Sequence, residues 1–456
     1  MLGLFDHPIE KSVLLVLQQQ QIPELTAGLT ERDLTRAMHR LKQDHHLLSD
    51  HPDQPELLDC HPLIREYFGG CLKQKTGAWQ QAQQRLYEYY KDLPEKHLPD
   101  TVVEMQPLFA AISHGCAAGL HQQAMHEVYW SRIQREGKNY LCGKLGAFSD
   151  DLATLAHFFT QPWLQPATGL TELDQALVLS WAGFRLRGLG RLAEAAQPMR
   201  ACLAMYDKHE KSQDVAIAAN NLSELLVTLG NLAEARHYGS LSIDYADRSG
   251  DLFLRMASRT TLADALLQRG ELQQALALFQ TAEQIQQERQ PEYPMLYSLP
   301  GFQYCSLLLA QGEVGYVLVR AAYDLDCWEN HFTNGGLLDF SLPKLSLAKA
   351  HSLYMSGYVG ANPSYETCYT NGLDSTADET LATGVQILSD IMPEQVPSYA
   401  TPVEKTDHAQ KAGEFLELSV AGLRAAGGNK MSYHLPYSLA PPTFACGWTL
   451  KPPIKT

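Results

Sequence analysis

Apolar and small residues recur at fixed positions between residues 171 and 316, and this pattern predicts paired amphipathic helices. In each unit a leucine lies four residues before a glycine, and a small residue lies seven before it. Positions eight and four before the glycine share one face of a helix. The repeated glycines are Gly190, Gly230, Gly270 and Gly312, so the first two intervals are equal and the third is slightly longer.

Each of these glycines predicts the turn of a helical hairpin. Glycine adopts left-handed backbone angles without steric cost, so it can end the first helix. An apolar residue two positions later and an alanine five positions later then begin a second helix, and these alanines are Ala195, Ala235 and Ala275. One hairpin cannot bury its own apolar face, so stacked hairpins are expected to share a core. The pattern therefore predicts an all-α, helical-hairpin solenoid.

This register resembles the tetratricopeptide repeat. The small residue, the leucine, the Gly-x-Leu-x-x-Ala phrase and a later small residue (Cys202, Ser242 or Ala282) fall where that motif places them. The usual period is about 34 residues, and the longer spacing here is that of longer-helix variants. The tryptophan of the first motif position is absent. The resemblance implies a binding or sensing scaffold without catalysis, with a protein or peptide partner.

The concave face of such a solenoid is the predicted binding surface. It is expected to contain the first-helix positions at offsets of −13, −10, −6, −3 and −2 from each glycine. Amide and carboxylate groups in a groove can hydrogen-bond a peptide backbone; the alternative is that they are ordinary solvated polar residues of a helix. The candidate groove residues are Phe184, Arg187, Asn220, Glu224, Thr260 and Asp264.

Residues 1–68 predict a small winged-helix-like domain. Apolar residues indicate a helix over residues 10–20, and Thr30 followed by Asp33 has the form of a capping box that opens a second helix. The turn-rich segment 51–55, between short apolar pieces, predicts a hairpin. The phrase His-Pro-Leu-Ile-Arg-Glu-Tyr-Phe at residues 61–68 follows, with its proline suited to a helix start.

This order of segments resembles the C-terminal half of bacterial STAND-type signalling ATPases, in which an NTPase module precedes a winged helix and a tetratricopeptide sensor. The sequence contains no Gly-x-x-x-x-Gly-Lys-Ser/Thr phosphate loop. We therefore expect a truncated or split member of that family, which has lost the ATPase; a separate NTPase chain is one candidate partner.

The remaining segments depart from the regular repeat. Residues 69–170 predict a helical connector with an irregular hairpin at Gly119, and residues 171–316 the regular array. Residues 317–430 predict degenerate repeats with loop insertions, including helices over 337–354 and 409–426. The proline-rich tail at 431–456 is expected to be disordered.

Composition narrows the class of function. The formal net charge of −15 argues against nonspecific nucleic-acid binding, although it permits a basic peptide partner. Nine cysteines without a Cys-x-x-Cys pair fit reduced thiols. We find no apolar run of about 18 residues, as a membrane span would need, and no signal peptide. The predicted location is the cytoplasm.

Motifs for enzyme chemistry are weak. The phrase Gly188-Leu-Gly190-Arg-Leu-Ala193 literally matches a dinucleotide fingerprint but lacks the preceding strand, so we interpret it as a hairpin turn. The pairs at His45-His46 and Asp59–His61 have no second pair at ligand spacing. No catalytic residue, metal site or cofactor is therefore predicted.

An alternative function is transcriptional regulation through the winged helix. The helix expected from Thr30 to His46 carries a modest basic cluster on a possible recognition helix. Its acidic neighbours dilute that charge, and nucleic-acid binding is the less favoured hypothesis. The cluster comprises Arg32, Arg36, His39, Arg40 and Lys42.

Overall fold

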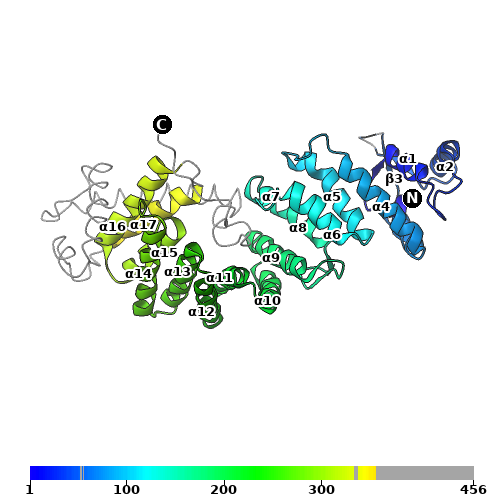
Figure 1. The fold of residues 1–456 in the computed structure, drawn as a ribbon. Helices are drawn as coiled ribbons and strands as arrows, with labels where there is room; N and C mark the ends of the chain where they lie inside the picture. The colour runs from blue at the N-terminus through cyan, green and yellow to red at the C-terminus, as the bar shows by residue number, and fades with distance from the viewer. Residues whose placement is uncertain (52–53, 55, 333–336, 356–456) are drawn as a thin grey trace, which may run out of the picture. The chain divides into compact units, whose positions relative to one another are not determined.

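The computed structural model describes residues 1–51, 54, 56–332 and 337–355, which Figure 1 shows as a coloured ribbon. The chain divides into two compact units, Met1–Val178 and Leu179–Thr456. The helix expected over 409–426 and the tail expected to be disordered lie outside the described residues.

The first unit begins with a small antiparallel sheet and two helices. Strands β1 (Ile9–Glu10), β3 (Leu57–Asp59) and β2 (Ser49–Asp50) lie in that order, and Ile9 pairs with Leu58. The short helix η1 (Leu2–Leu4) precedes the first strand, and helices α1 (Lys11–Gln19) and α2 (Glu31–Gln43) follow it. The predicted capping box of α2 is confirmed, because Thr30 Oγ1 accepts from the Asp33 N–H at 3.2 Å.

The rest of this unit is mainly helical. Pro62 occupies the first turn of its helix, as expected, and Gly119 turns the chain in the left-handed region at φ +85°. The elements are α3 (Pro62–Lys73), α4 (Thr76–Asp92), α5 (Val102–Ala117), α6 (His121–Gln123), the π-helix η2 (Ala124–Ile133), α7 (Tyr140–Gly143), α8 (Phe148–Ala156), β4 (Phe159–Gln161) and β5 (Gln165–Pro166).

The second unit consists of successive antiparallel helices, and α9 crosses into it from the first. The helix expected over residues 337–354 is observed as α17. The elements are α9 (Glu172–Gly188), α10 (Leu192–Lys208), α11 (Ser212–Thr228), α12 (Leu232–Ser249), α13 (Leu252–Gln268), α14 (Leu272–Arg289), α15 (Ser298–Ala310), α16 (Val314–Asp326), η3 (Cys327–His331) and α17 (Leu337–Met355).

The four repeat glycines form the hairpin turns that their sequence predicts. Their φ angles lie between +76° and +84°. In each turn, the N–H of the residue after the glycine donates to the carbonyl of the leucine four before it, at 2.9 Å. This is the Schellman arrangement, which satisfies a carbonyl left open at a helix end. The leucine thus serves both the turn and the core.

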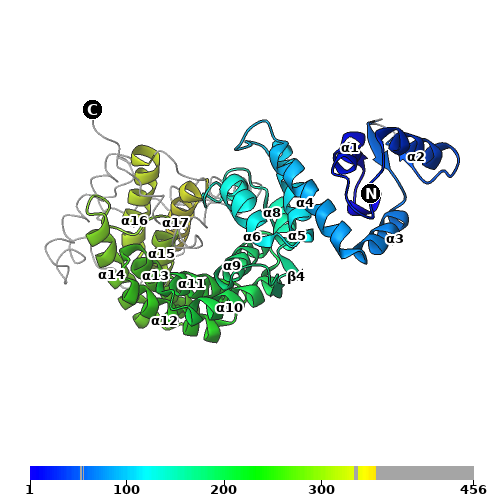
Figure 2. The ribbon, with the colours of Figure 1, turned by 45° about the vertical axis from the view of Figure 1, so that its right-hand side comes forward.

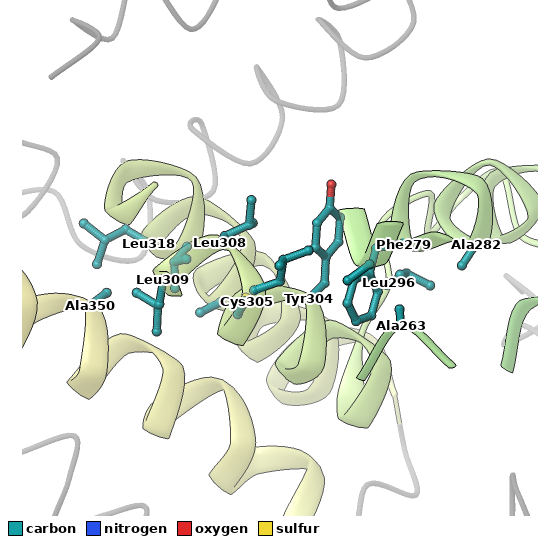
Figure 3. Close-up of a cluster of buried hydrophobic side chains, with 14 of the residues drawn as sticks. Ala263, Phe279, Ala282, Leu296, Tyr304, Cys305, Leu308, Leu309, Leu318 and Ala350 are labelled. Atoms are coloured by element: carbon teal, nitrogen blue, oxygen red, sulfur yellow. The ribbon is translucent and has the colours of Figure 1, made fainter. Parts of the chain in front are cut away.

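The core of the second unit lies between the two rows of helices. Ala263, Ala282 and Cys305 occupy the predicted small positions and are buried (Figure 3). The rings of Phe279 and Tyr304 stack with centroids 5.0 Å apart and an interplanar angle of 6°. Such a stack adds to the free energy gained from burying both rings. The all-α solenoid is therefore observed.

The fourth hairpin departs from the other three. Helices α9, α11 and α13 each have 17 residues, whereas α15 has 13. Residues 250–251 alone join α12 to α13, but residues 290–297 join α14 to α15. The first helix has lost a turn and the connection before it has grown longer. This change leaves space for a pocket between α13 and α15.

Candidate functional site

Helices α11, α13 and α15 form the inner row of the second unit. Helix α11 packs on α13 and α13 packs on α15, while α12 and α14 pack on the outer side of α11 and α13. Figure 2 shows α11, α13 and α15, the first helices of their hairpins, on the inner side of the curved array of the second unit. The predicted groove positions therefore lie on helices that are neighbours in space.

Glu224 of α11 is the centre of a polar cluster on this row. Arg187 Nη2 donates to Glu224 Oε2 at 2.9 Å, and Asn220 Nδ2 donates to Glu224 Oε1 at 3.2 Å. Thr261 Oγ1, from α13, is 3.4 Å from the same Oε1. One carboxylate thus joins side chains from three successive first helices.

Two polar atoms beside Glu224 have no hydrogen-bond partner among the described residues. They are Arg187 Nη1 and Asn220 Oδ1, and both atoms are buried. Asn220 as a whole is 4% exposed. Burying a polar group without a partner costs about 1–3 kcal/mol. One free donor and one free acceptor match what a peptide group offers.

A small pocket adjoins this cluster. Its volume is about 70 Å³, well below the roughly 300–1,000 Å³ of small-molecule sites. Apolar side chains make up much of its wall, and Glu224 reaches it from the polar cluster. The lining residues are Glu224, Phe253, Met256, Ala257, Thr260, Thr261, Gln286, Arg289, Leu296, Tyr297, Ser298, Leu299, Pro300 and Gln303.

The long connection before α15 supplies one wall of the pocket and is held by hydrogen bonds. Glu283 Oε1 accepts from the Leu296 N–H at 3.0 Å, and Gln286 Nε2 donates to the Tyr293 carbonyl at 2.9 Å. Glu283 also pairs with the buried guanidinium of Arg320, with Oε2 3.0 Å from Nη1. These contacts fix the connection against α14 and α16.

Ser298, the first residue of α15, has a strained backbone conformation. Its φ is +57°, which is uncommon for a residue other than glycine. Its N–H donates to Asp324 at 3.0 Å, and its Oγ donates to Asp339 Oδ1 at 2.5 Å. Such a conformation costs about 1–3 kcal/mol and persists where the surroundings determine it. Burial and the nearby Asp339 raise the pKa of the Asp324 carboxyl well above its usual range.

Asp264 lies beside the pocket without a cationic partner among the described residues. Its carboxylate accepts from Gln268 Nε2 and from Gln303 Nε2, each at 3.4 Å. Burial raises the pKa of Asp264, and the charge of Glu224 adds to this shift. The amides offset little of its charge, because both hydrogen bonds are long.

The structure brings most of the predicted groove residues together. Arg187, Asn220 and Glu224 form the polar cluster, Thr260 lines the pocket, and Asp264 bonds to the pocket residue Gln303. Phe184 is buried at 4% exposure, and the Arg185 guanidinium lies 5.1 Å from its ring centroid. The binding role of all six remains a prediction.

Sequence reasoning missed the pocket walls that come from outside the first-helix positions. Gln286 and Arg289 lie at the end of a second helix, and Leu296 and Tyr297 lie in the connection. The available signal was the last interval between repeat glycines, Gly270 to Gly312, which is longer than the two before it. It marked an insertion but not its position.

The basic cluster of α2, on which the DNA-binding alternative depends, is largely paired with acids. Three of its cations lie within ion-pair distance of carboxylates on α2 itself, just after it, or on β2. Arg32 and His39 are exposed. The pairs are Arg36–Asp33 at 3.9 Å, Arg40–Asp44 at 3.8 Å and Lys42–Asp50 at 2.5 Å.

The described part of the chain carries few features of a metal, disulfide or membrane site. No group of three or more His, Cys, Asp or Glu side chains there has an arrangement suited to a metal ion. The seven cysteines among those residues are not joined in disulfides. Among the helices that the structure describes, none combines the length and apolar character of a membrane span.

Comparison with known proteins gives a distant structural match. No protein-family model and no curated protein matches the chain. Among solved structures, a signal transduction ATPase with numerous domains (STAND) protein with a tetratricopeptide repeat sensor, from Pyrococcus horikoshii, matches at 12% identity and a TM-score of 0.29. The match covers 87% of this chain and 63% of that one.

Proposed function

We propose that this chain is a non-enzymatic scaffold that binds a protein or peptide on the inner row of its helical array. The proposal rests on the buried, unpartnered Arg187 Nη1 and Asn220 Oδ1 beside Glu224. A peptide group would supply the missing carbonyl acceptor and N–H donor. Binding would then remove a cost that the free protein bears.

The same cluster explains why the three side chains would act together. Glu224 bonds to Arg187 and to Asn220, and therefore holds the free donor and the free acceptor in place. Its side chain is 11% exposed, so solvent screens the ion pair with Arg187 less than it screens a surface pair. We infer that Glu224 positions the two atoms that contact the peptide backbone.

The finer proposal is that the array is the sensor of a STAND-type signalling protein, with an NTPase module among its partners. The segment order and the phrase at residues 61–68 support it. If the purified chain shows no association with an NTPase module encoded next to it, this finer proposal fails while the scaffold proposal stands.

Peptide selection tests the scaffold function. A random linear peptide library is panned against the full chain, and affinities of synthetic versions of the enriched peptides are measured by calorimetry. Glu224→Gln keeps the size of the side chain but removes its charge, and we expect about tenfold weaker binding, equal to about 1.4 kcal/mol. Thermal unfolding of each variant verifies the fold.

Glu234→Gln is the matched control. Glu234 pairs with Arg200 at 2.7 Å, on the outer helices α10 and α12. We expect this variant to bind as the native chain does. Failure to enrich any peptide would contradict the scaffold function. Weaker binding by Glu234→Gln alone would place the site on the outer helices instead of the inner row.

A further inference from the structure

The pocket and Asp264 are neighbours with different chemistry. Phe253, Met256, Leu296 and Leu299 give the pocket an apolar wall, and Met256 and Leu296 are 5% and 3% exposed. Gln303 both lines the pocket and donates to Asp264 Oδ2. The carboxylate is thus one amide group away from the apolar space.

The size of the pocket limits what can enter it. Its volume of about 70 Å³ suits the end of one apolar side chain and excludes a nucleotide-sized ligand. Burial of apolar surface there would stabilise a complex, against the costs of association. A single anchoring side chain in a closed pocket is a common source of binding energy.

The charges around the pocket differ in how they are compensated. Glu224 is paired with Arg187. Arg289 lies with its guanidinium 5.2 Å from the Phe253 ring centroid and donates to Gln290 Oε1 at 2.8 Å. Asp264 has two long amide contacts and no cation among the described residues. A positive charge from a partner is therefore most favoured at Asp264.

We propose that the pocket takes an apolar side chain of an extended peptide, and that Asp264 takes a lysine or arginine two positions from it, because alternate side chains of an extended chain point to the same side. This inference rests on the proposed function and adds the chemistry of the partner. The net charge of −15 favours approach of a basic segment over an acidic one. The partial burial of Asp264 strengthens its attraction for a cation relative to a fully exposed carboxylate.

The peptides enriched on the full chain provide the first measurement. We expect an apolar residue two positions from a lysine or arginine to be over-represented among them, relative to the starting library. One enriched peptide is then synthesised in two forms, with its basic residue kept or replaced by glutamine. Both forms are titrated against the native chain and against Asp264→Asn.

These four affinities form a double-mutant cycle, which isolates the interaction between Asp264 and the basic residue of the peptide. Asp264→Asn should weaken binding of the basic peptide at least fivefold and leave the glutamine form almost unchanged. The matched control Asp244→Asn, at an exposed position of α12, should alter neither affinity. Ala257→Leu places a larger side chain in the pocket and should weaken both peptide forms, whereas Ala277→Leu, at an exposed position of α14, should not.

The possible failures are distinguishable. Enriched peptides without basic residues, or equal binding of the basic peptide by native chain and Asp264→Asn, would overturn this inference while the scaffold function stands. A library that yields no binding peptide would overturn both. Melting temperatures of Asp264→Asn and Ala257→Leu near that of the native chain establish that lost binding is not lost folding.

Discussion

The third and fourth hairpins of the second unit share a sequence signature but differ in helix length and in the space that they leave on the inner face. In the third hairpin, α13 has 17 residues and α14 has 18, and a two-residue connection precedes them. In the fourth, α15 and α16 have 13 each, and residues 290–297 come first. The pocket lies where the shortened α15 meets α13. A regular repeat fills its inner face with helix, and the irregular one leaves space there.

The two hairpins also differ in how they accommodate left-handed backbone. The third turns at Gly270, where φ is +80° and an added Cβ would meet nothing within 4 Å. The fourth likewise turns at Gly312, where φ is +84°, but its first helix also begins at Ser298, a non-glycine residue in the same region that Asp324 and Asp339 hold. Strain of this kind often accompanies functional sites. It agrees with placing the binding pocket at the fourth hairpin.

The largest expected effect comes from removing the ring that joins the two hairpins. Phe279 of α14 is fully buried and stacks on Tyr304 of α15. Phe279→Ala should lower the free energy of unfolding by about 3–5 kcal/mol, because it deletes buried surface and leaves a cavity. Urea unfolding followed by circular dichroism measures the change.

Leu229→Ala is the control for that substitution. Leu229 lies just after α11 and is 41% exposed, so its loss should cost far less. If both variants lost the same stability, the stacked pair would not couple the regular array to the fourth hairpin.

A smaller, pH-dependent effect is expected from Asp324. Because its pKa is raised in the folded chain, the folded state keeps a proton that the unfolded state has released. Stability from this group is complete below its ordinary value of 3.8 and is lost as the pH rises through its folded pKa. Asp324→Asn should remove that decline.

The measurement is the difference in unfolding free energy between native chain and Asp324→Asn at several pH values above 4. The difference is needed because other groups titrate too. In the first unit, burial lowers the pKa of His114 to about 3, so its contribution is lost as the pH falls below about 6.5. A difference that does not change with pH would contradict the assignment to Asp324.

Sequence reasoning went furthest where each residue had a local task. The glycines, the leucines four before them and the small positions each act through one turn or one helix contact, so spacing alone predicts them. The polar cluster was partly predictable for the same reason, since Asn220 and Glu224 are one helical turn apart. The predicted capping box at Thr30 formed because its two partners are close together in the sequence.

Features that depend on distant contacts were not predictable. The pairing of Ile9 with Leu58 joins segments far apart in the sequence, and nothing local in Ile9–Glu10 indicates a strand. The pocket depends on where the extra length of the fourth unit was absorbed. Glu283 settles that by holding Leu296 and Arg320 together, a contact between separate elements that the repeat pattern does not contain.

Methionine methyl NMR of the full chain tests most directly whether a partner binds the inner row from the Glu224 cluster to the pocket at the fourth hairpin. Met256 lines the pocket, whereas Met199 is buried in the first hairpin, against Gly183. Met256→Leu and Met199→Leu assign the two signals. Titration with an enriched apolar–basic peptide should shift the Met256 signal and leave that of Met199 in place. A shift at Met199 with Met256 unchanged, or equal shifts at both, would contradict the account.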